Sequence, residues 1–183
     1  MNENDEASDP LASPDEIATK YTAVCEWADL SALQANLWLL EAYKQMIDGV
    51  HRVIDSVEAG MSTSRFLALR DLFLTDGHRL TQGDLQRRAK TTSGSVTRLI
   101  DALEHDGLIV RMPSITDRRT NYVELTTDGL NLCERLIPAV AHYSVDVCAG
   151  MNVASRERFV RLLKVLCQGI EQTTQGPRAA DSK

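Results

Sequence analysis

The chain has 183 residues, of which 43% are hydrophobic, 25% are charged and only 5% are aromatic, a composition typical of a globular protein whose Leu, Val, Ile and Ala favour helices over a β-sandwich. The net charge of −6 is unevenly spread, because residues 1–60 carry −9, residues 61–125 carry +2 and residues 126–183 carry +1. The acidic, polar first 14 residues argue against a signal peptide, and no run of about 18 apolar residues suits a membrane helix, so we expect a cytoplasmic protein with no membrane partner.

The N-terminal third of the chain is predicted to be helical. Residues 1–14 hold two prolines and several acidic side chains, and we expect them to form a disordered tail. A short helix is predicted over residues 15–28. A long helix is predicted over residues 31–57, where apolar residues recur at steps of three, four or seven, and Gly60 ends it.

Three shorter helices are predicted in the central, basic block. The last two cover residues 82–89 and 93–105, and each is preceded by a threonine that suits the N-cap position, Thr81 and Thr92. A tight turn at residues 90–91 joins them. Two short helices joined by such a turn form a predicted helix-turn-helix.

A β-pattern follows this helix pair. Residues 108–112 and 121–125 are predicted strands, the second with a clear period-two alternation. The polar segment between them holds Asp117, Arg118 and Arg119, so we predict a hairpin with a basic tip. Arginines at an exposed hairpin tip have little packing purpose, which favours a role in binding.

Two long helices are predicted after the hairpin, over residues 127–149 and 155–172, and residues 173–183 are expected to form a loose tail. Pro138 should kink or fray the first of these helices, since proline lacks the amide N–H that a helix needs. The predicted fold class is therefore mainly α with a small β-hairpin wing, that is, a winged helix-turn-helix flanked by long helices.

The helix over residues 93–105 has the features of a helix that enters the major groove of DNA. Its first turns carry small polar positions that allow the backbone to approach the base edges, namely Ser93, Gly94, Ser95 and Thr97. Arg98 follows, where it can reach a phosphate, and the free N–H groups of the helix N-terminus attract anions. An arginine at the hairpin tip gains from the negative potential of the adjacent minor groove. The alternative is a polar helix face that is merely solvated.

The order and spacing of several short motifs are similar to those of the MarR family. The motifs are LTQGDL at residues 80–85, SVTRLIDALE at 95–104, DGLI at 106–109, DRR at 117–119 and VELTTDG at 123–129. Together with the flanking long helices, the resemblance covers about residues 31–172.

This resemblance implies a homodimeric transcriptional regulator, usually a repressor, that binds a pseudo-palindromic operator in double-stranded DNA. It assigns residues 15–60 and 127–172 to dimerisation and residues 61–126 to DNA binding. The implied fold is a winged helix-turn-helix plus a helical dimerisation region.

Carried over residue by residue, the resemblance places one group of side chains near bases: Ser93, Gly94, Ser95 and Thr97. It places Thr81, Gln82 and Arg98 near phosphates. Arg119 matches the wing arginine that enters the minor groove, with Arg118 as the second choice, and Asp117 matches an acid that braces the wing. Thr92 completes the candidate DNA-binding set.

Members of this family are often released from DNA by a small aromatic or phenolic effector, bound in a cleft between the dimerisation helices and the DNA-binding lobe. The candidate lining residues here are Trp38, Tyr43, Met46, His51 and Phe66, which suit such a pocket but equally suit ordinary packing. We expect no other cofactor.

Some relatives instead sense oxidants through one cysteine near the start of the chain, and Cys25 is the only cysteine there. Glu26 and Asp29 nearby would oppose the thiolate that such a sensor needs. Cys148 and Cys167 fall in apolar helical stretches and are interpreted as buried, reduced thiols.

No pattern indicates catalysis or a metal site. The four cysteines form no CxxC pair, the four histidines form no HxxxH or HExxH motif, and no GxSxG or glycine-rich phosphate loop is present. We therefore expect no catalytic residue, no metal and no enzyme. Two alternatives to a ligand-responsive repressor stay open: a winged-helix module that binds a protein partner and no DNA, and a repressor that senses oxidants through Cys25.

Overall fold

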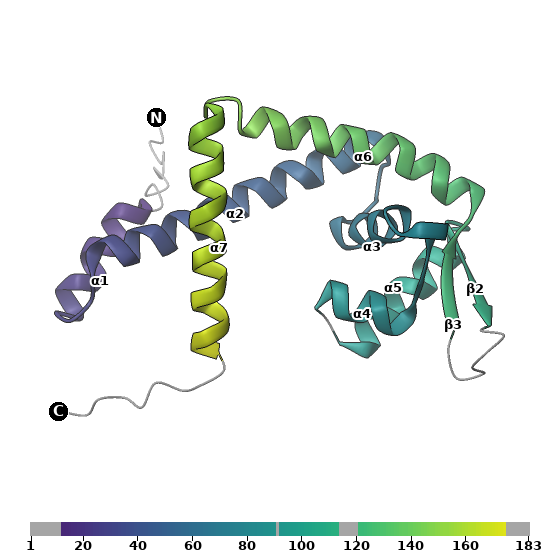
Figure 1. Ribbon diagram of the computed structural model, residues 1–183, viewed down its shortest axis with the longest axis horizontal. Helices are drawn as coiled ribbons and strands as arrows, with labels where there is room; N and C mark the ends of the chain where they lie inside the picture. The colour runs from purple at the N-terminus through teal and green to yellow at the C-terminus, as the bar shows by residue number, and fades with distance from the viewer. Residues whose placement is uncertain (1–11, 91, 114–120, 175–183) are drawn as a thin grey trace, which may run out of the picture.

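The computed structural model describes residues 12–90, 92–113 and 121–174. In chain order these form α1 (Pro14–Val24), α2 (Leu30–Val57), α3 (Thr63–Phe73), the short 3-10 helix η1 (Asp76–His78), β1 (Arg79–Thr81), α4 (Gln82–Ala89), α5 (Ser93–His105), β2 (Ile109–Pro113), β3 (Asn121–Leu125), α6 (Thr127–Val147) and α7 (Val153–Thr174). Figure 1 shows that α3, α4, α5 and the strands form one lobe, from which α2 and α6 extend toward α1 and α7. The predicted fold class, mainly α with a winged helix-turn-helix, is confirmed.

The two N-terminal helices begin where polar side chains cap them. Ser13 and Glu16 form a capping box at the start of α1, and the Asp29 carboxylate caps the start of α2. Because Asp29 begins a new helix, α1 ends at Val24, and the prediction that it continues to residue 28 is wrong.

α1 is fixed to the N-terminal half of α2 by one carboxylate. Asp15 Oδ1 accepts a hydrogen bond from Gln34 Nε2 at 2.9 Å and another from Trp38 Nε1 at 3.1 Å. Ala18 is fully buried, whereas most other side chains of α1 are exposed. The helix therefore has a defined position on α2, with most of its surface uncovered.

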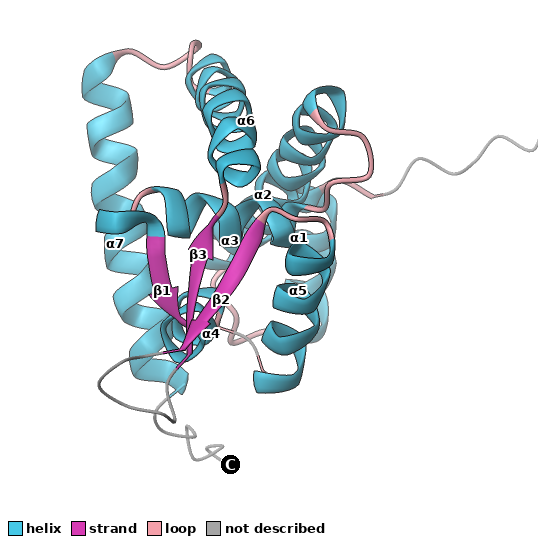
Figure 2. Ribbon diagram, turned by 90° about the vertical axis from the view of Figure 1, so that its right-hand side faces the viewer, coloured by secondary structure: helices cyan, strands magenta, loops and turns pink. Residues whose placement is uncertain are grey.

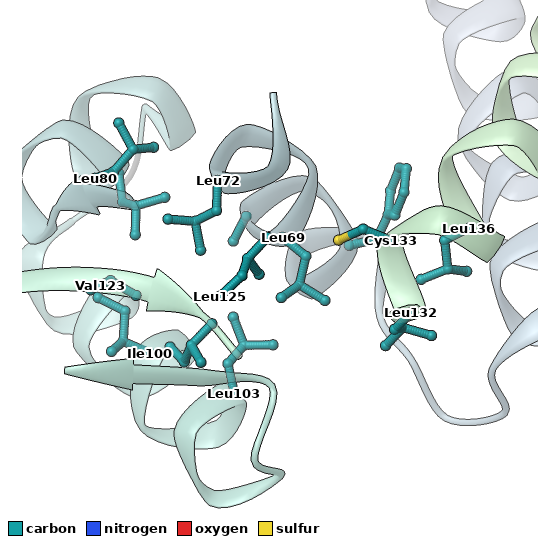
Figure 3. Close-up of a cluster of buried hydrophobic side chains, with 14 of the residues drawn as sticks. Leu69, Leu72, Leu80, Ile100, Leu103, Val123, Leu125, Leu132, Cys133 and Leu136 are labelled. Atoms are coloured by element: carbon teal, nitrogen blue, oxygen red, sulfur yellow. The ribbon is translucent and has the colours of Figure 1, made fainter. Parts of the chain in front are cut away.

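The hydrophobic core lies in the lobe and extends to α6. Leu69 and Leu72 of α3 lie between the sheet and α5 on one side and α6 on the other (Figure 3). The side chains at most 4% exposed in this core include Ile54, Phe66, Leu69, Leu72, Leu85, Val96, Ile100, Leu103, Leu132 and Leu136. Because burying one aliphatic side chain contributes about 1.5–3 kcal/mol, this cluster fixes α3, α5 and α6 relative to one another.

A three-stranded antiparallel sheet in the order β1-β3-β2 forms the wing, where the sequence predicted only a two-stranded hairpin (Figure 2). β2 and β3 pair as predicted, with Ile109 opposite Leu125. The additional strand, β1, has three residues, too few to show a period-two alternation, and its Leu80 is buried opposite Val123. The segment before α4 is therefore tied to the wing.

The first turn of α6 lies very close to the base of the wing. The Thr126 hydroxyl accepts a hydrogen bond from the Gly129 amide at 3.1 Å and donates one to the Gly107 carbonyl at 2.7 Å. Gly129 is buried, and a Cβ placed on it would lie 2.1 Å from the Leu108 carbonyl oxygen. Only glycine allows this approach, which joins α6 to the lobe.

α6 is one helix of 21 residues and continues through Pro138 without interruption. It crosses α2 closely at Gly49, where a Cβ would lie 1.8 Å from Tyr143 Oη. The lobe, α6 and the C-terminal half of α2 therefore form one packed unit.

α7 stands apart from the rest of the chain (Figures 1 and 2). None of its residues is buried, and Phe159, Leu162 and Ile170 are 46%, 57% and 51% exposed. The interpretation of Cys148 and Cys167 as buried thiols is wrong for the single chain, because Cys148 is half-buried and Cys167 on α7 is exposed. Among the helices that the structure describes, none combines the length and hydropathy of a membrane-spanning segment.

Candidate nucleic-acid interface

The helix-turn-helix consists of two capped helices and a left-handed turn residue. Thr81 Oγ1 accepts a hydrogen bond from the Asp84 amide at 3.0 Å and donates one to Asp84 Oδ2 at 2.7 Å. This hydroxyl, together with the Arg87 guanidinium, holds the pKa of Asp84 below its ordinary value. Lys90 closes the turn with a φ of 47°, and Thr92 caps α5. Both predicted N-caps are confirmed.

The buried sides of the two helices decide which side chains face outward. Leu85 of α4 and Val96 and Ile100 of α5 lie in the core. This anchoring leaves the other positions of the N-terminal turns of α5 at the surface, where all are exposed except Thr97, which is half-buried. We call this set the α5 surface; it comprises Thr92, Ser93, Gly94, Ser95, Thr97 and Arg98.

Gln82 connects the start of α4 to the α5 surface. Gln82 Nε2 donates a hydrogen bond to Thr97 Oγ1 at 2.9 Å, and this hydroxyl donates one to the Ser93 carbonyl at 3.0 Å. Both side chains are half-buried, as is Thr81, which precedes Gln82. The structure thus brings the eight predicted DNA-contact residues outside the hairpin tip to the N-terminal ends of two adjacent helices.

The approach to the α5 surface is open at Gly94. A Cβ placed on this residue would have no other atom within 4 Å. A ligand that binds here can therefore come close to the backbone N–H groups of the first turn, which carry the positive end of the helix dipole.

The hairpin residues Asp117, Arg118 and Arg119 lie outside the described residues. β2 ends at Pro113 and β3 begins at Asn121, at the same end of the lobe as α4 (Figures 1 and 2). Their predicted roles in the minor groove and in bracing the wing stay predictions.

Arg111, which the sequence did not single out, connects the wing to α5. Its guanidinium forms salt bridges with Asp101, at 2.5 Å, and with Glu104. The hydrogen bond to Asp101 raises the pKa of Arg111. This arginine therefore braces β2 against α5. The spacing of Asp101 and Glu104 by three residues on one helix face is the sequence signal for it.

Additional positive charge lies at the C-terminal end of α4. Arg87, Arg88 and Lys90 are exposed, and Lys90 stands in the turn that leads to α5. Arg88 Nη1 donates hydrogen bonds to the Thr75 hydroxyl at 3.1 Å and to the Asp71 carbonyl at 3.3 Å, so Arg88 also ties α4 to α3. The sequence signal was three basic residues within positions 87–90.

The five predicted effector-contact residues do not meet within one chain. Trp38, Tyr43, Met46 and His51 are exposed along α2, whereas Phe66 is a core residue. Three hollows of about 380, 360 and 200 Å³ lie respectively at α1, between α3, α4 and α5, and beside the end of α2, and none of the three is lined by these five residues. The effector site stays a prediction.

Cys25 is half-buried and lines the hollow at α1, next to Tyr21 and Val24. Oxidant sensing by Cys25 also stays a prediction.

Comparison with known proteins gives the same assignment at three levels. Residues 61–120 match the model of the MarR family. The HTH-type transcriptional repressor YetL of Bacillus subtilis is 30% identical over 154 residues, which cover 79% of this chain and 89% of YetL. The DNA complex of the MarR family regulator Sco3205 from Streptomyces coelicolor superposes with a TM-score of 0.69 at 20% identity, covering 78% of this chain and 89% of that one. The structure of BpsR from Bordetella bronchiseptica, a protein whose DNA binding is regulated by 6-hydroxynicotinic acid, superposes with a TM-score of 0.63 at 24% identity. The superposition covers 73% of this chain and 98% of BpsR.

Proposed function

The chain belongs to the MarR family of transcriptional regulators, and we propose that it is a repressor that binds a pseudo-palindromic operator in double-stranded DNA as a homodimer and leaves it when a small effector binds. The observation that carries the DNA-binding part of this proposal is the α5 surface. It is a capped helix N-terminus with an open glycine and small hydroxyl side chains, held from behind by core residues. A helix with this outer face suits the major groove of B-DNA, which is about 12 Å wide.

The proposed contacts divide into base and phosphate contacts. The hydroxyls of Ser93 and Ser95 can both donate to and accept from base edges, whereas the hydroxyl of Thr97, which donates to the Ser93 carbonyl, can accept from them. The phosphate contacts are assigned to Thr81, Gln82, Arg98 and the additional cation Lys90, and the minor-groove contact to Arg119 or, as second choice, Arg118. Phosphate contacts supply most of the affinity and base contacts supply the specificity.

The homodimer is supported by two uncovered apolar helix faces. On α2, Leu40, Tyr43 and Met46 are 62%, 58% and 45% exposed, and α7 has no buried residue. Apolar surface of this kind marks a place where another chain binds. A two-fold dimer would present two α5 surfaces to half-sites about 34–36 Å apart, which is the geometry of a pseudo-palindromic operator.

Two similar proteins support repression and release by an effector. YetL is named a repressor, and the DNA binding of BpsR is described as regulated by 6-hydroxynicotinic acid. We extend this to a small aromatic or phenolic effector for the present chain, with the exposed residues of α2 as its candidate contacts. Such a ligand releases DNA only if it binds the DNA-free conformation more tightly than the DNA-bound one.

We further propose that the protein has no catalytic activity and acts in the compartment that holds the DNA. Its curated relatives are regulators, and the groups that converge at the α5 surface are hydroxyls, an amide and cations, which suit binding.

Fluorescence anisotropy of the full chain on labelled fragments of its own upstream region tests the proposal. We expect tight binding to one fragment, a log–log salt slope of several units, and binding to a scrambled fragment that is about 1,000-fold weaker or more. Addition of hydroxylated benzoates and phenols should release the specific fragment. Equally weak binding to every upstream and genomic fragment would contradict the proposal and favour a winged-helix module that binds a protein partner.

A further inference from the structure

Thr97 stands in the α5 surface with most of its hydrogen-bonding capacity already in use. Its hydroxyl donates to the Ser93 carbonyl at 3.0 Å and accepts from Gln82 Nε2 at 2.9 Å. A hydroxyl carries one proton and two acceptor lone pairs. Because the proton is on the Ser93 carbonyl and one lone pair is on Gln82, a single lone pair remains. Toward DNA, this hydroxyl can therefore accept a hydrogen bond but cannot donate one.

The two helices hold this arrangement in place. Thr97 follows the buried Val96 on α5, and Gln82 is the first residue of α4, directly after its N-cap Thr81. Both Thr97 and Gln82 are half-buried. Since Thr97 has given its proton to a carbonyl, its other partner must be a donor, and this fixes the amide of Gln82 with the nitrogen, not the oxygen, toward Thr97.

Gln82 has a second N–H, which suits the phosphate contact that we have proposed for it. Phosphate oxygens accept hydrogen bonds, so an amide nitrogen that donates twice can bind a phosphate and Thr97 at the same time. The hydrogen bonds then run in one direction, from Gln82 to Thr97 and from Thr97 to Ser93. A contact to the DNA backbone is thereby joined to a side chain that faces the bases.

We infer that Gln82 is a positioning residue for sequence recognition and that Thr97 accepts a hydrogen bond from the exocyclic amino group of adenine or cytosine in each half-site. Among the four bases, adenine N6 and cytosine N4 are the donors in the major groove, whereas guanine and thymine present only acceptors there. Guanine or thymine at this position would place an acceptor against an acceptor. The inference rests on the proposed operator binding and deepens it, because it states which chemical group one side chain recognises.

Anisotropy on a series of operator duplexes tests the base preference. Each duplex carries one base-pair change, made symmetrically in both half-sites. For the wild-type chain we expect one position at which adenine and cytosine are bound alike and guanine and thymine at least about tenfold more weakly. Thr97→Val keeps the branched shape without the hydroxyl and should reduce these differences to less than about threefold, whereas Thr97→Ser keeps the hydroxyl and should retain the preference.

Gln82→Met tests the positioning role, because it removes the amide and keeps a similar side-chain length. We expect it to reduce the preference at the same position as Thr97→Val, and the combination of the two should reduce it no further, as for residues that act as one unit. Arg98→Gln is the matched control, since it removes a proposed phosphate contact outside this hydrogen-bonded pair. It should weaken binding to every duplex by a similar factor and leave the preference unchanged.

Three results would overturn the inference. The first is a uniform loss of affinity for Gln82→Met with the wild-type base preferences, which is the behaviour of a phosphate contact alone. The second is a preference for guanine or thymine at the position that Thr97→Val affects, and the third is no position that Thr97→Val affects. The Thr97→Val profile stands whether or not Gln82→Met folds. A wild-type chain that binds every duplex and a scrambled fragment equally contradicts the proposed function itself.

Discussion

Gly94 and Gly129 are both glycines in the first turn of a helix, but they are there for different reasons. At Gly94 the space that a side chain would fill is empty, so nothing within the described chain requires glycine. At Gly129 the same space holds the carbonyl group of Leu108. The packing of the chain on itself therefore explains the second glycine and not the first, for which we propose the approach of DNA from outside.

Gly94→Ala should separate stability from binding. Alanine removes the conformational freedom of glycine in an exposed helix, so we expect the free energy of unfolding to rise by about 0.5 kcal/mol. The new methyl group stands where we propose that DNA approaches the backbone, so affinity for the operator should fall about tenfold, which corresponds to about 1.4 kcal/mol. Thermal unfolding and anisotropy on the same protein measure the two changes. A variant that is stabilised and binds the operator as tightly as wild type would show that Gly94 does not face DNA.

The acidity of the Cys133 thiol depends on its burial in the core. Burial in the core raises the pKa of its thiol from 9.0 to about 11. Because the folded pKa lies above the unfolded one, this thiol favours the folded state below about pH 9, and that contribution is lost as the pH rises through about 11. We expect iodoacetamide at pH 8.5 to modify Cys133 about 100-fold more slowly in the native protein than in denaturant. Equal rates in the two states, measured by mass spectrometry of the peptide, would contradict its burial.

At the scale of the element, amphipathic periodicity and capping residues predicted most helices, and pairing between distant segments escaped prediction. The α4 and α5 boundaries follow from Thr81 and Thr92, because an N-cap acts on residues two or three positions away. β1 was missed because its only signal is pairing with β3, more than 40 residues later in the chain. The Arg111 brace was likewise missed, because the spacing of Asp101 and Glu104 shows that they share a helix face but not that β2 places a cation against them.

Gly129→Ala should disrupt the junction between α6 and the base of the wing. The alanine Cβ would lie 2.1 Å from a backbone oxygen, so α6 or the strand entry has to move. We expect a loss of about 2 kcal/mol or more in the free energy of unfolding, although alanine is intrinsically the better helix former. Gly150→Ala is the matched control, because a Cβ there meets no atom within 4 Å. A chain that tolerates both substitutions equally would contradict the close approach at Leu108.

At the scale of the whole molecule, the chain is a lobe with a complete core attached to helices whose apolar faces are largely uncovered. The core around Leu69 explains why the lobe and α6 form one unit, and the absence of buried residues in α7 explains why a single chain is an incomplete structure. The sequence indicated helical dimerisation segments only through the family resemblance. The apolar stripe of an amphipathic helix shows that one face is buried, but it does not show whether the same chain or a second chain buries it. For the same reason, the effector residues on α2 could be suggested from residue type but not assembled into a pocket.

Charging the apolar face of α7 should therefore affect assembly more than folding of the lobe. Phe159→Lys with Leu163→Lys is expected to shift the protein to monomer at micromolar concentration and to weaken operator binding about 100-fold or more, since one half-site is lost. Glu157→Lys changes the charge by the same amount on the same helix and should leave the dimer intact. Sedimentation velocity and anisotropy report the two effects. A stable dimer in the doubly charged variant would show that α7 is not an interface helix.

The central claim, that the α5 surface recognises the DNA sequence, is tested most directly by the ratio of affinities for the operator and for a scrambled fragment. Ser95→Ala with Thr97→Ala removes two hydroxyls from this surface, and we expect the ratio to fall about 10- to 1,000-fold, mainly through weaker operator binding. Thr19→Ala with Ser144→Ala removes two hydroxyls that, like that of Thr97, donate to the carbonyl four residues earlier in their own helices, and this pair should leave the ratio unchanged. An unchanged ratio in the Ser95 and Thr97 variant, with the wild-type protein still specific, would contradict the account and place sequence recognition elsewhere on the molecule.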